Sequence, residues 1–552
     1  MTALSSPHFE ALKKIEPDLR NLLPAELYAD IYVADWADQI ESANPAEADK
    51  EDGRKIKEVF DHLASLQKIL SDYTSSLITE KRDDKARLQA FKRNGALMFT
   101  DLAGFTKLME ANAVKGNEGA NDLLRVFNGY FTDIIEVIIK SGGELLEFTG
   151  DALLVLFASP LSADEGANHV TLQKSIAKAV RAGLRMQRAM EKYKAIETPS
   201  GNIELKMRIG IHAGHFYSAD IGTPRRREHV LLGRNVQLAK LTESKGQNGA
   251  VNLSPEAYAY VQNDFRFSPN AVHEGYMLAQ DDFGDALSDY EMMAKSNTRR
   301  LASAVLYEKT FAATYEAIQR LLDVIKELAS FIPNPVLNLL VESAAKRRII
   351  PEFPTPIVMF VNFIGLPEMI DKGMFEEESV IASFNETFAR LNAAVEKRGG
   401  VLKKVTYHLT GSDIVIYFGV PTAHTNDAVR AASAALDIRN IIMKTKLPAL
   451  KPGCEDPEAG AEDRIYCKIG INFGPTFVAE IGDPRGRREF NVLGDTVNTT
   501  ARLMSKAEKN QIYISKAVME QIQEKYQCEF VGDVQLKGKG AAMSIYQLTG
   551  QK

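Results

Sequence analysis

An internal repeat constrains this chain more than any other feature of its sequence. The segment MRIGIHAGHFYSADIGTPRRREHVLLG is similar to a later segment, CKIGINFGPTFVAEIGDPRGRREFNVLG. Asp101 corresponds to Asn362 in the second copy, and Gly233 corresponds to Gly494; in both cases the two positions are 261 residues apart. Chance similarity would hardly return to one offset over that distance, so we expect two homologous domains.

The repeat divides the chain into four segments. We expect an N-terminal helical region at 1–92, a first domain at 93–298, a helical connector at 299–352 and a second domain at 353–549. Leucines recur at helical intervals in the first segment. Its charged end, 80–92, would join it to the first domain. The helical region could be a packing extension or a sensor that binds a partner.

Both repeats show the same order of predicted elements. A buried-type strand is followed by a long helical stretch, a two-strand hairpin, another helix and further strands. A Gly-Gly pair precedes each hairpin, and the second hairpin is four residues longer than the first. This β-α-β-β-α-β order is typical of a ferredoxin-like α+β domain with a mostly antiparallel sheet.

The composition excludes several kinds of partner. Hydrophobic residues make up 45% of the chain, and the net charge of -6 gives no reason to expect nucleic acid. Cys454, Cys467 and Cys528 lack paired spacing, which argues for a reducing compartment. The N-terminus lacks the apolar core of a signal peptide, and no stretch approaches the ~18 apolar residues that cross a bilayer. We therefore expect a cytoplasmic protein without a transmembrane segment.

The first repeat carries two aspartates in contexts that would bring them together. Asp101 ends an apolar strand, and Asp151 sits in the turn of the hairpin. In a ferredoxin-like sheet these elements are neighbours, so both carboxylates could bind Mg²⁺, which prefers oxygen ligands. Two ions there could clamp the attacking and leaving oxygens of a phosphoryl displacement. Alternatively, Asp101 caps the following helix and Asp151 fills a turn.

The second repeat lacks both carboxylates. Asn362 and Ser412 stand at the equivalent positions. Asp413 is one residue out of register, and strand alternation is expected to turn it to the other face of the sheet. We expect no second metal site here.

These motifs resemble class III nucleotide cyclases, in particular the soluble adenylyl cyclases with two domains in tandem. FTDLAGFT followed by GGxxxxxxGDALLxLF is similar to the metal-binding half of that family. The resemblance implies that Asp101, Asp151 and the backbone carbonyl of Leu102 bind two Mg²⁺ ions, for which Mn²⁺ could substitute. It also implies an intramolecular head-to-tail pseudodimer with one working and one degenerate site, catalytically sufficient as a monomer.

The second repeat resembles the half that binds the substrate. A lysine four residues after the Gly-Gly pair contacts adenine in the family, and Lys404 stands there, with Asn491 as its expected partner. The family pattern GxxVNxxxR matches Asn498, implied to position the ribose, and Arg502, implied to stabilise phosphate charge. Lys537 in LKGKG resembles a lysine that contacts the terminal phosphates. Taken singly, Lys404 could be a solvated strand residue, and Arg502 could pair with a surface carboxylate.

The two repeats complement one another. The first has Glu147 at the base-contacting position. It has Gln237 and Leu241 at the positions equivalent to Asn498 and Arg502. Neither repeat has a full set of functional residues, yet the two together have one. The resemblance therefore implies an adenylate cyclase that converts ATP to 3′,5′-cyclic AMP and pyrophosphate.

The choice of base depends on Lys404 and Asn491. Family members that use ATP commonly have Asp or Thr as the partner, and either accepts a hydrogen bond from the adenine amino group. Asn491 can accept through its carbonyl oxygen and can equally donate. A guanylate cyclase, or a catalytically inactive nucleotide-sensing homologue, is therefore the alternative.

The degenerate pocket would be lined by Glu147, Lys240, Asn362 and Ser412. In bicarbonate-stimulated soluble cyclases this pocket binds the anion through basic residues, so a small-molecule or anion regulator is one interpretation. Glu147 replaces one of those basic residues, and a carboxylate repels an anion. A collapsed structural pocket is the other interpretation.

Overall fold

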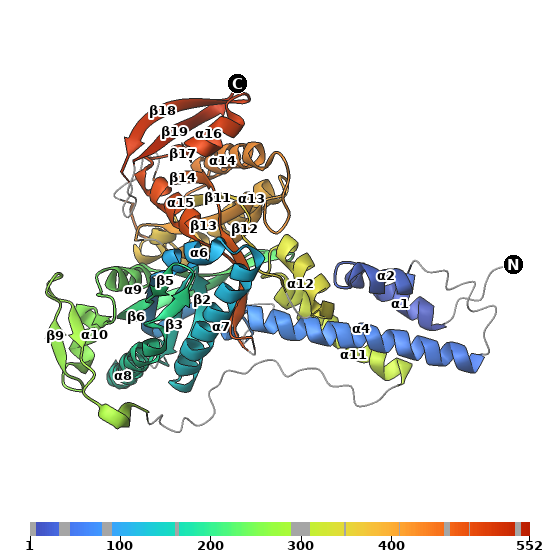
Figure 1. The fold of residues 1–552 in the computed structure, drawn as a ribbon, viewed down its shortest axis with the longest axis horizontal. Helices are drawn as coiled ribbons and strands as arrows, with labels where there is room; N and C mark the ends of the chain where they lie inside the picture. Colours follow the sequence, from blue (N-terminus) through green and yellow to red (C-terminus); the bar gives the residue numbers. More distant parts are fainter. Residues whose placement is uncertain are drawn as a thin grey trace. The chain divides into compact units, whose positions relative to one another are not determined.

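The computed structural model describes residues 7–32, 45–79, 91–160, 165–288, 310–346, 349–407, 409–456, 464–484, 486–535 and 542–552. They form two compact units (Figure 1). The first unit comprises Met1–Thr74, Pro224–Arg226 and Arg299–Ile350, and the second comprises Ser75–Thr223, Arg227–Thr298 and Pro351–Lys552. Most of the charged segment 80–92 lies outside the described residues.

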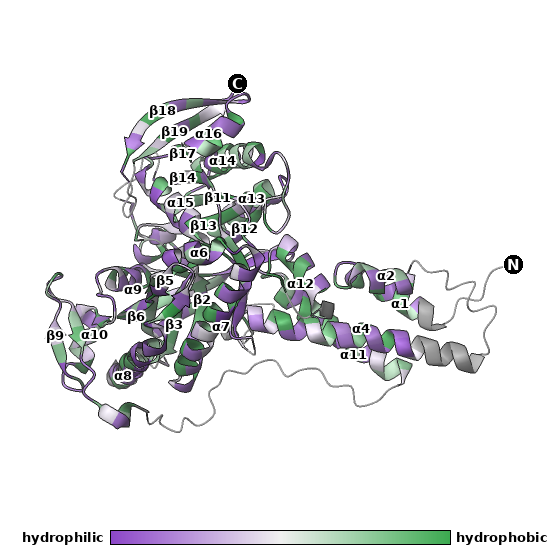
Figure 2. Cartoon of the chain, viewed as in Figure 1, coloured by the Kyte–Doolittle hydropathy of each residue, from purple (hydrophilic) through white to green (hydrophobic). Residues whose placement is uncertain are grey.

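The first unit is helical. Its helices are α1 (Pro7–Leu19), α2 (Ala25–Tyr32), α4 (Pro45–Tyr73), α11 (Phe311–Ala329) and α12 (Asn334–Lys346). Hydrophobic and hydrophilic residues alternate along α4 (Figure 2), whose buried Val59, Leu63, Leu66 and Leu70 recur every three or four positions. That spacing gives one apolar face, which packs against α11 and α12. No helix among the described residues is long and apolar enough to span a membrane.

The first repeat in the second unit forms one mixed sheet. The strand order is β2-β3-β1-β6-β8-β10-β9, and β7 pairs with β6. The strands are β1 (Phe91–Ala103), β2 (Glu144–Thr149), β3 (Ala152–Ala158), β6 (Lys206–Thr223), β7 (Arg226–Leu232), β8 (Val251–Leu253), β9 (Phe267–Pro269) and β10 (Met277–Ala279). A separate small hairpin consists of β4 (Ile196–Thr198) and β5 (Gly201–Ile203). The helices are α5 (Ser76–Thr79), α6 (Phe105–Ala113), α7 (Asn117–Lys140), α8 (Glu165–Ala189), α9 (Arg234–Ser244) and α10 (Pro255–Val261).

The second repeat forms the equivalent sheet, in the order β12-β13-β11-β14-β17-β19-β18. The strands are β11 (Ile357–Ile364), β12 (Val401–Tyr407), β13 (Ser412–Phe418), β14 (Tyr466–Phe473), β17 (Ile512–Ser515), β18 (Tyr526–Val534) and β19 (Met543–Gln551). A separate hairpin consists of β15 (Phe477–Gly482) and β16 (Arg488–Leu493). The helices are α13 (Glu377–Glu396), α14 (Asp427–Met443), α15 (Asp495–Lys506) and α16 (Lys516–Ile522).

The predicted fold class is confirmed. In each sheet a central strand, β1 or β11, pairs antiparallel with two neighbours, and one parallel pair follows, β6 with β8 or β14 with β17. Long helices supply apolar faces to these sheets, and the main core clusters contain residues of both strands and helices. This is the layered α+β arrangement that the element order predicted.

Each repeat inserts a hairpin into the core of the other. Phe477 and Ile481 of β15 belong to the first repeat's core, and Ile221 of β6 belongs to the second repeat's core. Each repeat also donates one backbone hydrogen bond to an asparagine of the other repeat, at equivalent positions. The N–H of Gly482 donates to Asn128 Oδ1 at 3.3 Å, and the N–H of Gly222 donates to Asn385 Oδ1 at 2.6 Å. The repeats therefore form an intramolecular head-to-tail pseudodimer.

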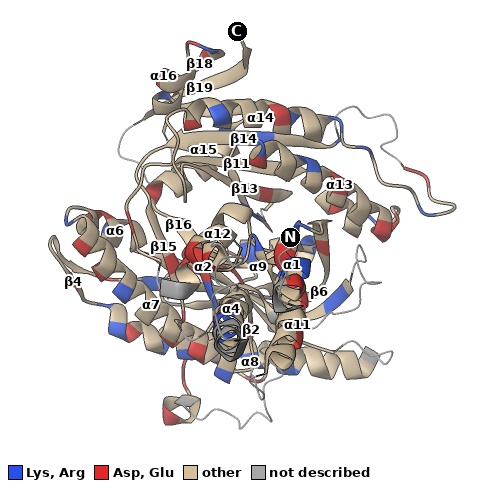
Figure 3. Cartoon of the chain, turned by 90° about the vertical axis from the view of Figure 1, so that its right-hand side faces the viewer, with Lys and Arg blue, Asp and Glu red and all other residues tan. Residues whose placement is uncertain are grey.

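Charged residues of both signs are interspersed on the helices α7, α8 and α14 (Figure 3). An exposed pair such as Lys140–Glu136 contributes at most about 1 kcal/mol, because water screens it. By contrast, the ion pairs that Lys403 and Lys404 form with Glu489 are largely buried, and both lysines line the candidate site.

Candidate active site

Two adjoining cavities lie between the repeats. One has a volume of about 330 Å³ and the other about 660 Å³. Both are lined by Asp101, Phe105, Asp151 and Asn498. The first three come from the first repeat and Asn498 comes from the second, so each cavity has walls from both halves of the chain.

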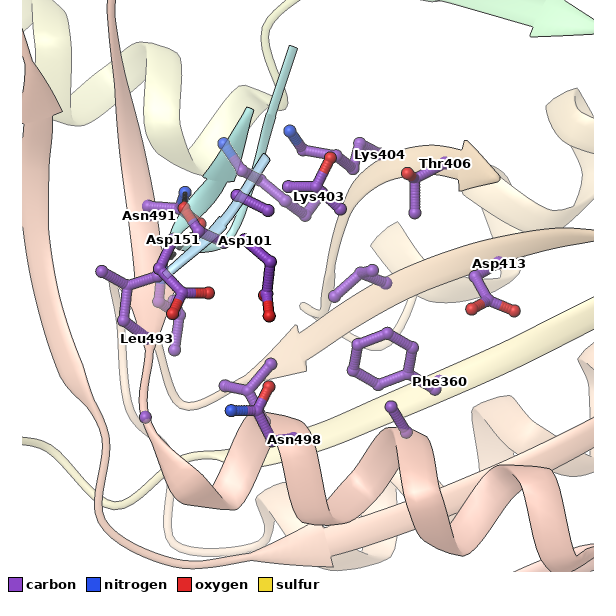
Figure 4. A pocket seen from close by; sticks show the side chains of 18 of the residues that line it. Asp101, Asp151, Phe360, Lys403, Lys404, Thr406, Asp413, Asn491, Leu493 and Asn498 are labelled. Atoms are coloured by element: carbon purple, nitrogen blue, oxygen red, sulfur yellow. Dashed lines mark hydrogen bonds between the residues drawn. The ribbon is translucent and has the colours of Figure 1, made fainter. Parts of the chain in front are cut away.

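The two aspartates of the first repeat face the same space (Figure 4). Asp101 lies near the end of β1, and Asp151 lies in the turn between β2 and β3. Gly150, just before it, has φ 74°, a left-handed conformation that only glycine adopts without strain. Burial and, to a smaller extent, the nearby charge of Asp101 together raise the pKa of Asp151 to about 7.

This pair suits a hard divalent cation. Two carboxylates that repel one another in a cavity are stabilised when a cation lies between them. Leu102 lines the larger cavity beside Asp101. Among the described residues, no cluster of three or more His, Cys, Asp or Glu side chains could hold a metal. A cation here would therefore need oxygens from a substrate or water to complete its shell.

A chain of partly exposed ion pairs connects Asp101 with the buried carboxylate of Glu243. Asp101 Oδ2 accepts a hydrogen bond from Arg208 Nη2 at 2.7 Å, and Arg208 Nε donates to Glu243 Oε1 at 2.5 Å. Glu243 Oε2 accepts from Lys240 Nζ at 2.8 Å. The charge of Lys240 in turn lowers the pKa of Asp151 against the larger effect of burial. The chain thus links both carboxylates through Glu243, which is fully buried.

The helix α15 of the second repeat presents Asn498 and Arg502. Their spacing of four places them on one face. Asn498 projects from the helix into the smaller cavity (Figure 4) and also lines the larger one, together with Arg502. The helix begins after Gly494, whose φ of 132° is a conformation that favours glycine and whose Cα lies close to the end of the Met109 side chain.

Two consecutive lysines of β12 line the smaller cavity. A β-bulge at Lys403 interrupts the pairing between β12 and β13, so Lys403 and Lys404 both contribute to the same wall. Lys404 Nζ donates to the backbone oxygen of Phe148 and forms ion pairs with Glu489 (3.0 Å) and Glu147 (3.4 Å). Lys404 therefore bridges the two repeats.

Glu489 of β16 stands between these lysines. Its Oε1 lies 2.5 Å from Lys403 Nζ and 3.0 Å from Lys404 Nζ. Burial would raise its pKa, but the two lysines and Arg487 lower the pKa to about 2. Burial lowers the pKa of Lys403 to about 8, although the charge of Glu489 acts in the opposite direction. For Lys404, the attraction of Glu489 and Glu147 outweighs burial, so its pKa is raised. The carboxylate thus keeps at least Lys404 charged.

Asn491 also lines the smaller cavity, two residues after Glu489 on β16. Its Nδ2 donates to the backbone oxygen of Gly150 at 3.3 Å, and its Oδ1 accepts from the N–H of Val492 at 3.1 Å. Both ends of its amide therefore have protein partners. Lys537 lies outside the described residues.

The prediction for Asp413 was wrong. In the structure Asp413 lies directly opposite Asn362, and Asn362 Nδ2 donates to its Oδ1 at 2.9 Å. Residues directly opposite one another on neighbouring strands share a face, so Asp413 shares the face of Asn362. It lines the smaller cavity at the end away from Asp101 and Asp151 (Figure 4).

The four residues predicted for a degenerate pocket have different surroundings. Lys240 lines the smaller cavity and pairs with Glu243. Glu147 forms an ion pair with Lys404. Asn362 donates a hydrogen bond to Asp413, and Ser412 is buried at the start of β13. Of these four described residues, Lys240 alone lines either of the two cavities.

Sequence reasoning missed Arg208, Glu243, Lys403 and Glu489. Arg208 and Glu243 lie far from Asp101 in sequence, and nothing local marks their pairing. The signal for Lys403 was the dipeptide Lys403-Lys404 in a buried strand, where two consecutive charges break the expected alternation. The signal for Glu489 was a carboxylate two positions from Asn491, on the same side of the strand.

Comparisons with known proteins agree with this architecture. The family model of the adenylate and guanylate cyclase catalytic domain matches residues 90–280 and 353–550, together more than half of the chain. Adenylate cyclase type 10 of Rattus norvegicus is 22% identical over 423 residues, which cover 74% of this chain and 24% of that protein. Adenylate cyclase 1 of Rhizobium meliloti (strain 1021) is 24% identical over 182 residues, 33% of this chain and 25% of that protein. The chain thus spans about a quarter of the length of these relatives.

A solved structure shows the same fold over most of the chain. It is a class III adenylyl cyclase-like ATP-binding protein from Pseudomonas aeruginosa, with a TM-score of 0.50 and 15% sequence identity. The match covers 83% of this chain and 92% of that one. With the family model matched in both repeats, this chain belongs to the family of adenylate and guanylate cyclase catalytic domains.

Proposed function

We propose that this protein is an adenylate cyclase that converts ATP to 3′,5′-cyclic AMP and pyrophosphate at one site shared by the two repeats. One observation carries the proposal. Asp101 and Asp151 of the first repeat and Asn498 of the second line the same cavities, and Arg502 joins them in the larger one. Neither repeat supplies both halves of this set.

The first repeat would hold the metal. Asp101, Asp151 and the backbone carbonyl of Leu102 are the proposed ligands of two Mg²⁺ ions, with Mn²⁺ as a substitute. Bound Mg²⁺ would polarise the substrate's phosphate oxygens and lower the pKa of the attacking hydroxyl. Arg208 and Lys240, linked through Glu243, would keep the two carboxylates in place while the site is loaded.

The second repeat would orient the nucleotide. Asn498 would hold the ribose, so that its 3′-hydroxyl attacks the α-phosphorus while the bond to pyrophosphate breaks. Arg502, one helical turn farther along, would stabilise the negative charge that develops on the phosphates. The proton of the hydroxyl leaves to solvent or substrate. Lys537 is proposed to contact the terminal phosphates.

Lys404 and Asn491 are the proposed contacts to the base. Lys404 lines the cavity as a buried cation, and Asn491 lies on the neighbouring β16. Because both halves of the site lie in one chain, catalysis needs no second copy. We expect the activity in the cytoplasm. A small-molecule or anion regulator bound at Lys240 would have to share the smaller cavity with the substrate, because Lys240 lines that cavity.

The test is a direct assay of the purified protein. Incubation with Mg²⁺ and either ATP or GTP should yield cyclic AMP from ATP and much less cyclic GMP from GTP. Asp151→Ala should lower the rate about 100-fold or more, because one metal-holding carboxylate is lost. A preference for GTP would make the protein a guanylate cyclase. No cyclic product, with ATP bound, would make it a nucleotide sensor.

A further inference from the structure

Two lysines line the larger cavity without a role in the proposed function. Lys107 lies in the first turn of α6, and Lys206 begins β6, soon after the β4–β5 hairpin. Asp101, Asp151 and Asn498 line both cavities, whereas the two lysines line only the larger one. The lysines therefore lie beyond the carboxylates, on the side away from the smaller cavity.

The register of the sheet fixes the direction of Lys206. It lies opposite Ala103 on β1, and Arg208, two residues farther along β6, lies opposite Asp101. Residues two apart on a strand point to the same face of the sheet. On that face Arg208 Nη2 donates to Asp101 Oδ2 at 2.7 Å. The side chain of Lys206 therefore extends on the same side of the sheet as this carboxylate.

Lys206 is paired with a carboxylate that it can easily exchange. Its Nζ lies 3.0 Å from Glu204 Oε2, and the two side chains are 50% and 40% exposed. An ion pair so open to water is weak, so a more highly charged anion can displace Glu204. The backbone beside it is fixed, because a Cβ on Gly104 would collide with the backbone oxygen of Glu204. Lys107 forms no ion pair with any described residue, so both ammonium groups can turn to an anion in the cavity.

The second repeat has no cation at the positions of these two lysines. Glu368 and Tyr466 stand there instead. Glu368 Oε2 accepts a hydrogen bond from the N–H of Gly365 at 2.9 Å. Gly365 is equivalent to Gly104, which lines the larger cavity in the first repeat. The second repeat thus places its own carboxylate at the end of the central strand, where the first repeat has a cavity and two lysines.

We propose that Lys107 and Lys206 bind the pyrophosphate that leaves the α-phosphorus, and that Glu204 limits its affinity by competing for Lys206. This inference rests on the proposed cyclase reaction. An ammonium group is a compact charge with three N–H donors and suits the oxygens of a small polyanion. Two of them beyond the carboxylates meet the product on its way out of the cavity. Because Glu204 takes Lys206 back, the product is not trapped and the site is cleared for the next substrate.

The experiment measures the binding of inorganic pyrophosphate and Mg²⁺ to the full chain by titration calorimetry, without turnover. Lys107→Ala and Lys206→Ala should each weaken binding about 3- to 10-fold, and the double variant about 10- to 100-fold, since charge-assisted hydrogen bonds are lost. Lys140→Ala is the matched control. Lys140 is 52% exposed and pairs with Glu136, much as Lys206 pairs with Glu204, but it lines neither of the two cavities. This control should bind pyrophosphate as the wild type does.

Glu204→Gln should change the affinity in the opposite direction, which a folding defect would not do. It should bind pyrophosphate about 3- to 10-fold more tightly, because Lys206 loses its competitor and the cavity loses a negative charge. A loss in either lysine variant no larger than in Lys140→Ala, or binding by Glu204→Gln that is unchanged or weaker, would overturn the inference. The expected changes in a protein that forms no cyclic product from ATP would overturn the cyclase reaction and leave the pyrophosphate site standing.

Discussion

The two repeats share one fold but retain opposite halves of one site. Asp101 on β1 corresponds to Asn362 on β11, and Leu241 on α9 corresponds to Arg502 on α15. The second repeat has a carboxylate at Asp413 on β13, where the first repeat has Ala152. In our proposal, a change of a few side chains on one scaffold separates a wall that would bind the metal from a wall that would bind the nucleotide.

The hairpin exchange explains how both halves reach one cavity. β15 and β16 pack into the first repeat, so the start of α15 lies beside Gly150 and Met109. The reciprocal hairpin of β6 and β7 packs into the second repeat. Lys404 and Glu147, which are equivalent positions, meet at this interface as an ion pair. The packing of the two hairpins is thus symmetric between the repeats, whereas the charges at the equivalent positions Lys404 and Glu147 are opposite.

The largest effect that would test this comparison concerns α15 and α9. We expect Arg502→Ala to lower kcat by about 10² to 10³, because the charge that develops on the phosphates loses its partner. The matched control is Leu241→Ala at the equivalent position of the first repeat, which should change kcat little. Arg502→Lys should be intermediate, since lysine lacks the planar fork. Equal losses in Arg502→Ala and Leu241→Ala would mean that the two helices are not functionally distinct.

The next effect concerns the buried charges between the repeats. Glu489→Gln should destabilise the protein by about 3 kcal/mol at pH 7, because Lys403 and Lys404 lose their shared carboxylate. The pKa of Glu489 is lowered from its ordinary 4.5 to about 2, so its contribution is present above pH 4.5 and disappears as the pH falls toward 2. Urea denaturation at pH 7, 4 and 3 should show the wild type and Glu489→Gln converging as the pH falls. A constant difference would contradict the assigned charge state.

A smaller effect concerns the wall of Asp101 and Asp151, which we propose binds the metal. Glu243→Gln interrupts the ion-pair chain between Arg208 and Lys240 and should weaken Mn²⁺ binding about tenfold. Titration followed by electron paramagnetic resonance measures this directly, without turnover. Glu191→Gln, which removes an exposed ion pair with Lys194, is the control and should bind Mn²⁺ normally. Normal binding by Glu243→Gln would show that the chain does not position the carboxylates.

The sequence was informative where function depends on local context. The repeat offset predicted two equivalent α+β domains, and the strand and hairpin around Asp101 and Asp151 predicted where those residues lie. The spacing of Asn498 and Arg502 predicted a shared helix face. These inferences need only the periodicity of helices and strands and the chemistry of turns.

The sequence was silent where function depends on register and distant pairing. Strand alternation gave the wrong face for Asp413, because its pairing with Asn362 on β11 decides the face. The bulge at Lys403 placed two consecutive lysines at one cavity. The chain from Asp101 through Arg208 to Glu243 joins residues more than a hundred positions apart. Such contacts follow from tertiary packing and leave no local pattern.

The central claim is that one chain builds one site from both repeats. The most direct measurement is cyclic AMP formation by Asp151→Ala, by Arg502→Ala and by an equal mixture of the two at the same total concentration. We expect each variant to retain about a hundredth of the wild-type rate or less, and the mixture to do no better, because each chain closes its own site. A mixture that recovers about a quarter of the wild-type rate would show that the site forms between chains and would contradict this account.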